Sequence, residues 1–559
     1  MAEKLVVAYR GANGLKIQRG IDNPEEVLAL ACSAKEDTVC RCFQFSPSGR
    51  YFAYCDSKQT VCYDVTAKKE KFRIEGLART MKISFSPNEN LMITFQQYAI
   101  YGSRIAEDGT KREADPNLRF YDVRDGKEVA VKVCKYQVNW KPQFSVDEKF
   151  CVLKENGSEL HFYENNKFDR FTRKGIIKGL EIFELSPGLD PTLCCFIPST
   201  GGKPGIIQLR SPYEDLRVIT QKTSFNCDQC AFNWNSKGSA VLATTTVEVD
   251  KTNQSYYGIS CVYLLTKMGE SFQVHLNKEG PLHSMEWAPN GMSFIACFGY
   301  MPSKISVFNL RATVTWCLGE NHKNEVYFNP FGNLLAVCGF GNLAAGKIEV
   351  WDVEKKTEVV QMQVPNTTFF QWAPDGQHFL TATTAPRLRV DNNFRIWHYT
   401  GPLKHEFLSV DAENKNIELA QVTFKPASNE YNKFKVTELS DAERRKIENR
   451  RVGSTIPEHG VTTLKKAGVV TEGGKYVPPH QRKTQDSNSR PAQQKPQVNR
   501  VELTPQEKQL QKLKKKIDDI RKLQQKETEG VTLEVNQKQK LAKLPELEEE
   551  LRQLEVNGS

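Results

Sequence analysis

Short apolar strands that end in a large side chain and run into a tight polar turn recur along the first 430 residues. Nine residues anchor these repeats: Phe45, Phe85, Phe144, Leu185, Trp234, Trp287, Phe328, Trp372 and Phe424. Turn residues follow each anchor, as in Ser46-Pro47-Ser48-Gly49. The spacing, roughly 40 to 50 residues, is that of four-stranded propeller blades, which bury their faces against one another. The pattern predicts an all-β chain over residues 1–427 with nine blades, or eight if the degenerate Leu185 repeat is not a blade.

A second landmark lies within most repeats, where another strand ends in an aromatic or apolar residue followed by a polar one. Tyr63-Asp64 and Tyr121-Asp122 are examples, and Trp351-Asp352 matches the Trp-Asp dipeptide of WD40 blades. The fold class is therefore a nine-bladed WD40-like β-propeller. The apolar residues 5–9 form an early strand that could pair with the last blade and close the ring, which would remove an open sheet edge.

The character of the chain changes after Pro426. Residues 428–502 are rich in basic, Pro, Gln, Ser and Asn residues and predict a disordered basic linker. Within it, Asp441 to Arg451 predicts a short basic helix with an aspartate cap. Residues 503–556 predict a C-terminal α-helical hairpin, because Thr504-Pro505-Gln506-Glu507 is a helix start and leucines and isoleucines follow at helical spacing.

Positive charge is concentrated behind the predicted propeller. The chain carries 77 basic and 67 acidic residues, and residues 428–559 hold 27 of the former and 20 of the latter. Basic side chains neutralise nucleic-acid phosphates, so the tail is a candidate RNA-binding segment. Its candidate contacts are Arg444, Arg445, Lys446, Arg450, Arg451, Lys512, Lys514, Lys515, Lys516, Arg521 and Lys522. The alternative is a solvated helix whose charge is offset by its own Asp518, Asp519 and Glu527.

On the propeller, Arg387, Arg389 and Arg395 could present charge on one face. One or more of them could instead be structural, paired with Asp391 or with carbonyl groups at a blade edge.

The sequence offers no catalytic, cofactor or metal site. Gly341 to Lys347 fits the spacing of a phosphate-binding loop, but Ile348 replaces the required Ser or Thr and a strand follows, so this stretch is predicted to be a blade turn. Cys227 and Cys230 have no second metal-ligating pair. The fifteen cysteines lack a disulfide framework and indicate reduced thiols. No signal peptide or 18-residue apolar run is present. We therefore expect a cytoplasmic, monomeric, non-enzymatic protein without membrane contact.

Several stretches carry a resemblance to a known family. They are Pro116 to Asp122, Val249 to Thr252, Phe298 to Pro302, Gly339 to Leu343 and, most specifically, Trp372 to Gly401. In them the chain resembles eukaryotic translation initiation factor 2A. Subunit b of initiation factor 3 has a related propeller, but an RNA-recognition domain precedes it, whereas blades here begin almost at Met1.

The resemblance implies a factor that directs methionyl initiator tRNA to the small (40S) ribosomal subunit, in a codon-dependent and GTP-independent way, for a subset of mRNAs. The implied partners are the small subunit and the initiator tRNA, with mRNA and other initiation factors beside them. Two other hypotheses stay open: a WD-repeat protein scaffold without direct RNA binding, and an enzyme built on a propeller.

Overall fold

The computed structural model describes residues 5–448 apart from gaps at 32–38, 57, 78, 101–112, 136–139, 226, 247–259, 343 and 428–430; beyond residue 448 it describes only residues 520 and 544. The chain divides into two units, Met1–Glu458 and His459–Ser559. The first unit contains the propeller. The hairpin predicted over 503–556 lies outside the described residues, except for Ile520 and Leu544, which are helical, and so does the part of the predicted 428–502 linker from residue 449 onward.

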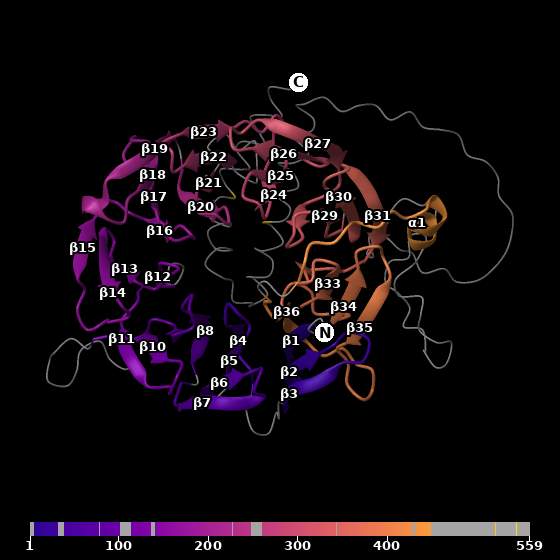
Figure 1. Cartoon of the computed structure of the whole chain (residues 1–559), viewed down its shortest axis with the longest axis horizontal. Helices are drawn as coiled ribbons and strands as arrows, with labels where there is room; N and C mark the ends of the chain where they lie inside the picture. The colour runs from indigo at the N-terminus through magenta and orange to yellow at the C-terminus, as the bar shows by residue number, and fades with distance from the viewer. Residues whose placement is uncertain are drawn as a thin grey trace. The chain divides into compact units, whose positions relative to one another are not determined.

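The described part of the first unit forms nine four-stranded antiparallel sheets arranged as the blades of a ring (Figure 1). Blade 1 combines the two ends of the propeller: β36 (Leu419–Phe424), β1 (Val6–Gly11), β2 (Gly14–Arg19) and β3 (Glu25–Ala31). Blades 2 to 4 contain β4 (Cys42–Phe45), β5 (Tyr51–Cys55), β6 (Gln59–Asp64) and β7 (Lys69–Glu75); β8 (Thr80–Phe85), β9 (Leu91–Gln96), β10 (Leu118–Asp122) and β11 (Glu128–Lys132); β12 (Gln143–Phe144), β13 (Phe150–Asn156), β14 (Glu159–Glu164) and β15 (Arg173–Ile176).

The remaining five blades follow in chain order. Blades 5 to 7 contain β16 (Ile182–Leu185), β17 (Leu193–Ile197), β18 (Gly205–Arg210) and β19 (Val218–Ser224), with a 3₁₀ turn at Glu214–Leu216; β20 (Gln229–Trp234), β21 (Ala240–Thr246), β22 (Ser260–Thr266) and β23 (Ser271–Val274); β24 (Leu282–Trp287), β25 (Ser293–Phe298), β26 (Ser303–Asn309) and β27 (Val314–Asn321). Blades 8 and 9 contain β28 (Glu325–Phe328), β29 (Leu334–Gly339), β30 (Lys347–Asp352) and β31 (Thr357–Gln363); β32 (Phe369–Trp372), β33 (His378–Thr383), β34 (Asn393–His398) and β35 (Leu403–Leu408).

Each repeated anchor is the last residue of the innermost strand of a blade. Phe45 ends β4, Leu185 ends β16 and Trp372 ends β32, and the other six anchors hold the same place. The nine-bladed prediction is therefore confirmed, and the degenerate Leu185 repeat is a true blade. Most anchors are buried in clusters shared by adjacent blades, which is how radial repetition supplies a core.

The polar residue after the anchor explains why the repeat includes a polar turn. The Ser46 hydroxyl accepts the N–H of Tyr51 at 3.0 Å, and the Asn329 side-chain carbonyl accepts the N–H of Leu334 at 3.1 Å. Each side chain thus holds the turn against the first residue of the next strand. These groups are fully buried, so satisfying them stabilises the turn.

The ring closes as the sequence predicts. β1 pairs with β36 in antiparallel register, with Val7 opposite Phe424. The described residues between Gly341 and Gly346 also behave as predicted, since they form the turn before β30 and a strand, not a helix, begins at Lys347. The fourteen described cysteines are free thiols, most of them buried. No helix among the described residues is long and apolar enough to cross a membrane.

Candidate functional site

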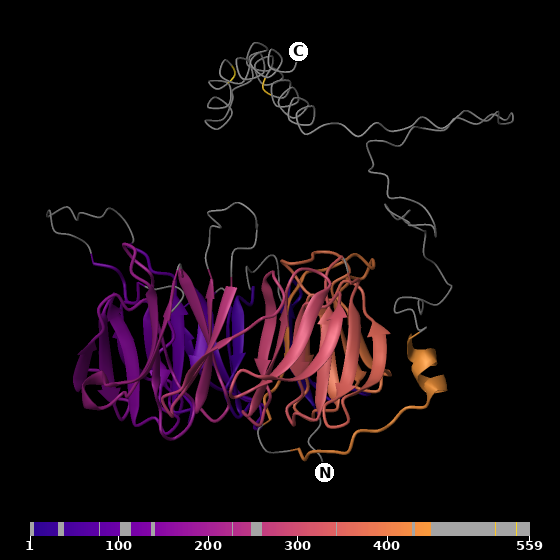
Figure 2. The same cartoon turned by 90° about the horizontal axis from the view of Figure 1, so that it is seen from above.

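The packed chain continues beyond the propeller boundary predicted at residue 427. We call residues 431–440 the strap, because they run from one face of the ring toward its rim (Figure 2). The Phe434 ring lies 6.2 Å from that of Phe331 and 5.4 Å from that of Tyr399. The Asn333 side chain donates to the Phe434 carbonyl at 2.9 Å. Part of the segment predicted as linker is therefore held against blades 8 and 9.

The strap delivers the chain to α1 (Asp441–Glu448), which lies against β31 at the rim of blade 8 (Figure 1). The aspartate cap predicted for this helix is wrong, because Ser440 lies at the cap and Asp441 is already the first helical residue. Ser440 and Glu443 form a reciprocal capping box, in which the Glu443 carboxylate accepts the Ser440 N–H at 2.9 Å. Serine takes the cap because Glu443, three residues on, can reach back to its amide. Ile447 packs over Gly401, where a Cβ would lie 2.6 Å from its Cγ2.

This docking decides which basic residues of α1 face solvent. Arg444 and Ile447, three residues apart, share the face turned to the propeller. Arg444 is half-buried, and its Nε has no hydrogen-bond acceptor among the described residues. Arg445 and Lys446 are exposed. The other predicted tail contacts lie outside the described residues: Arg450, Arg451, Lys512, Lys514, Lys515, Lys516, Arg521 and Lys522.

Arg387 and Arg389 lie on the loop between β33 and β34. Arg387 donates to the Thr368 carbonyl at 3.3 Å and lies 3.9 Å from a Glu325 oxygen; Arg389 lies 3.5 Å from Glu418. The carbonyl contact agrees with the structural interpretation of Arg387. The suggested pairing with Asp391 is wrong, because acidic groups of other segments are nearer: Arg395 pairs with Glu406 at 2.7 Å. Arg387 and Arg389 keep 58% and 66% of their side-chain surface exposed.

The loop that carries Arg387 and Arg389 and the strap that leads to α1 lie at opposite ends of strand β33. Gly376, in the turn before β33, lies against Phe331, which in turn contacts the strap. β33 starts at this end and finishes at Thr383, beside the arginine loop. The structure therefore does not gather Arg387 and Arg389 with the residues of α1 on one surface.

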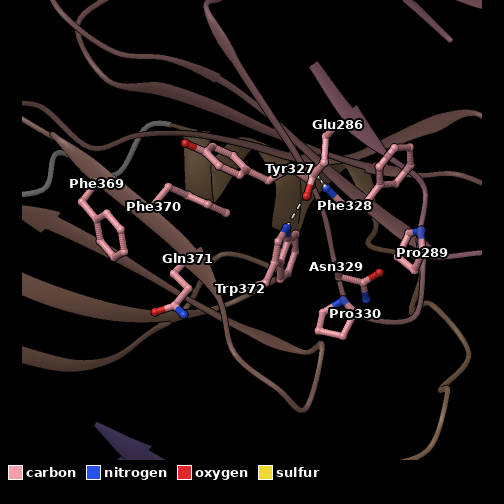
Figure 3. Close-up of a pocket in the computed structure, with 10 residues that line it drawn as sticks. All are labelled: Glu286, Pro289, Tyr327, Phe328, Asn329, Pro330, Phe369, Phe370, Gln371 and Trp372. Atoms are coloured by element: carbon pink, nitrogen blue, oxygen red, sulfur yellow. Dashed lines mark hydrogen bonds between the residues drawn. The ribbon is translucent and has the colours of Figure 1, made fainter. Parts of the chain in front are cut away.

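A pocket of about 490 Å³ opens among the innermost strands of blades 7, 8 and 9 (Figure 3). Ten residues line it: Glu286, Pro289, Tyr327, Phe328, Asn329, Pro330, Phe369, Phe370, Gln371 and Trp372. The Tyr327 ring stacks on Phe370 with centroids 4.8 Å apart, and the Trp372 indole donates to the Tyr327 carbonyl at 3.0 Å. These two contacts hold the Tyr327, Phe370 and Trp372 side chains against one another in the pocket wall.

Some neighbouring blades are joined at the centre of the ring by the residue directly before an anchor. In three blades its side chain accepts the backbone N–H of the next anchor, and we call this contact the inter-blade clasp. Gln143 accepts from Leu185 at 3.4 Å, Glu286 from Phe328 at 2.7 Å and Gln371 from Phe424 at 3.0 Å. The clasp ties neighbouring blades through an edge amide that would otherwise lack a partner.

Glu286 differs electrostatically from the two glutamines. Burial raises the pKa of its carboxyl to about 7, and the Phe328 N–H opposes that rise only in part. Glu184 holds the equivalent place in blade 5, where burial also raises its pKa to about 7 against the pull of Lys141. Sequence reasoning missed both, although their position immediately before an anchor was a usable signal.

Comparison with known proteins agrees with the fold. Residues 222–411 match the family model described as eukaryotic translation initiation factor eIF2A. A Caenorhabditis elegans protein named eukaryotic translation initiation factor 2A is 38% identical, with all of both chains covered. The Drosophila melanogaster protein of that name is 35% identical over 80% of this chain and 67% of its own. A crystal structure of a eukaryotic initiation factor covers 76% of this chain and 100% of its own, at 28% identity and a TM-score of 0.66.

The nine-bladed ring, together with the full-length match of the chain to one named factor, defines a β-propeller translation initiation factor. The chain belongs to the eukaryotic translation initiation factor 2A family.

Proposed function

We propose that this factor directs methionyl initiator tRNA to the small (40S) ribosomal subunit in the cytoplasm, in a codon-dependent and GTP-independent way, for a subset of mRNAs. The observation that carries the proposal is the 38% identity to a named initiation factor 2A across the whole of both chains. The factor acts by binding rather than by catalysis, with the propeller as platform and the basic tail as the RNA-contacting part.

The contacts around α1 support the proposal that the propeller is the platform and the basic tail contacts RNA. The strap and the capping box hold the start of the basic tail at the rim of blade 8, so Arg445 and Lys446 are presented at a fixed place. The tail beyond them carries the further lysines and arginines named above. Neutralising phosphates with such side chains releases counterions, and the resulting affinity falls as salt rises.

Salt-dependent binding tests the proposal. The full-length protein is compared with a variant in which Lys512, Lys514, Lys515, Lys516, Arg521 and Lys522 are replaced by serine. Affinities for methionyl initiator tRNA and for 40S subunits with an AUG-containing mRNA are measured across a KCl series, with and without GTP. The removal of each side chain that neutralises a phosphate should reduce the log–log slope by about 0.7 to 0.9. A variant with Asp518, Asp519 and Glu527 replaced by their amides is the matched control, and it should bind at least as tightly as the wild type.

The outcomes separate the hypotheses. Steep salt dependence that is absent from the serine variant and unaffected by GTP supports RNA binding through the tail. Binding to 40S subunits that is insensitive to salt and unchanged in the serine variant overturns it and favours the WD-repeat scaffold.

A further inference from the structure

The inter-blade clasp needs only a hydrogen-bond acceptor. Gln143 and Gln371 supply a neutral carboxamide oxygen, and the Glu286 carboxylate makes the same bond with one oxygen, Oε2. Five other blades also have a neutral residue directly before the anchor. Glu184 is the one other acidic residue at this position. Because glutamine would serve the fold equally well, the negative charge of Glu286 is not explained by the clasp.

The charge of Glu286 is also uncompensated within the described part of the chain. The ten residues that line its pocket include no lysine, arginine or histidine. Burial and the hydrogen bond from the Phe328 N–H determine the pKa of the Glu286 carboxyl, and neither supplies a positive charge. A half-buried carboxylate without a positive partner is unfavourable, and a cation brought by a ligand would relieve that cost.

Aromatic side chains line the pocket together with this carboxyl group. Tyr327, Phe369, Phe370 and Trp372 line the pocket, and the half-buried Phe369 ring stands at one side of it (Figure 3). Gln371 uses its carbonyl oxygen for the clasp and for the Thr423 hydroxyl at 3.0 Å. The pocket therefore combines one acidic group with aromatic side chains, of which Tyr327 and Phe369 are half-buried and Phe370 and Trp372 are buried.

We propose that this pocket binds an arginine side chain of a partner protein, with the guanidinium on the Glu286 carboxylate and its plane against the aromatic walls. A guanidinium forms strong charge-assisted hydrogen bonds with carboxylates and also stacks on aromatic rings, so it satisfies both features of the pocket. An RNA segment fits less well, because its phosphates would meet an uncompensated carboxylate and no cation. The site gives the factor a protein-binding function beyond the RNA contact proposed above.

The test uses the full-length protein labelled with 5-fluorotryptophan. The chain has seven tryptophans, and the ¹⁹F resonance of Trp372, in the pocket wall, is assigned with Trp372→Phe. The probe is the capped peptide acetyl-Gly-Ser-Arg-Ser-Gly-amide. Its citrulline analogue, which keeps the shape and loses the charge, is the ligand control. A saturable shift of the Trp372 resonance is expected with the arginine peptide, and the citrulline peptide should bind at least ten-fold more weakly.

Two variants identify the carboxylate. Glu286→Gln keeps an acceptor for the clasp, as the natural glutamines do, and should weaken the arginine peptide at least ten-fold. Glu184→Gln removes the equivalent charge from blade 5, outside the pocket, and should bind like the wild type. Thermal melting checks that both variants are folded.

Three results would overturn the proposal: equal binding of the citrulline peptide, unchanged binding by Glu286→Gln, or no shift of Trp372 at saturating arginine peptide. Adenosine monophosphate is titrated in parallel. A Trp372 shift with the nucleotide and none with the peptide would assign the pocket to nucleic acid instead.

Discussion

The Tyr399 hydroxyl accepts the backbone N–H of Thr437 at 2.9 Å, which joins the end of β34 to the strap. Tyr399 is almost completely buried, so in Tyr399→Phe the Thr437 amide loses its partner in a place that water reaches poorly. The loss should cost about 1–2 kcal/mol locally. We expect the Thr437 amide to exchange hydrogen at least five-fold faster in Tyr399→Phe, measured by hydrogen–deuterium exchange of the full-length protein.

Tyr9 provides the control for that experiment. Its hydroxyl is buried without a hydrogen-bond partner among the described residues, so Tyr9→Phe should not speed exchange in the strap. Equal exchange of Thr437 in the wild type and Tyr399→Phe would show that the strap does not depend on this bond.

Asn329 holds the turn that follows the blade 8 anchor. It accepts the Leu334 N–H and donates to the Gly376 carbonyl of blade 9 at 3.0 Å, and it is fully buried. Asn329→Ala should destabilise the propeller by about 2–3 kcal/mol, because two buried backbone groups lose their partner. Urea unfolding checks the value. Asn290→Ala is the comparison, since Asn290 is exposed and accepts only the Met292 N–H; it should cost less than about 1 kcal/mol.

Glu184 and Glu286 predict a pH dependence of stability. Their folded pKa values of about 7 lie above the ordinary glutamate value of 4.5, so the folded state holds more protons between pH 4.5 and 7. Stability should therefore fall as the pH rises through this window, by about 1–3 kcal/mol for each carboxyl. In the double variant Glu184→Gln/Glu286→Gln that part of the fall should vanish. Urea unfolding at pH 5 and pH 8 measures it, and an identical pH dependence in both proteins would contradict the assignment.

The docked face of α1 predicts that its three basic residues are not equivalent. Arg445→Ser/Lys446→Ser removes two exposed charges and should lower the salt slope of tRNA binding by up to about 1.8, with thermal stability unchanged. Arg444→Ser should change that slope less and should loosen α1, because Arg444 is half-buried beside Ile447. Limited proteolysis near residue 445 reports the loosening. A larger slope change for Arg444→Ser than for the double variant would contradict this orientation.

The propeller could be predicted from sequence because its period is long and its repeat has a physical cause. Each anchor ends an innermost strand, and residues such as Ser46 and Asn329 hold the following turn. Even the Leu185 repeat could be recognised, since its turn keeps Ser186, whose hydroxyl accepts the Thr192 N–H.

The candidate sites were harder to predict. Composition marks residues 431–440 as linker, because their few apolar side chains look insufficient for a core. The structure shows that Phe434 needs only the surface already formed by Phe331 and Tyr399. The pocket around Glu286 joins three blades whose lining residues lie up to 86 positions apart, and no local pattern reports such a contact.

Blade 1 also has a consequence for how the protein is made. Its outer three strands are synthesised first and its innermost strand last, since β1 begins at Val6 and β36 ends at Phe424. During translation, the edge of β1 that later pairs with β36 stays unpaired until eight other blades have emerged from the ribosome. Truncated products that stop before residue 419 keep that edge permanently open to pairing with another chain.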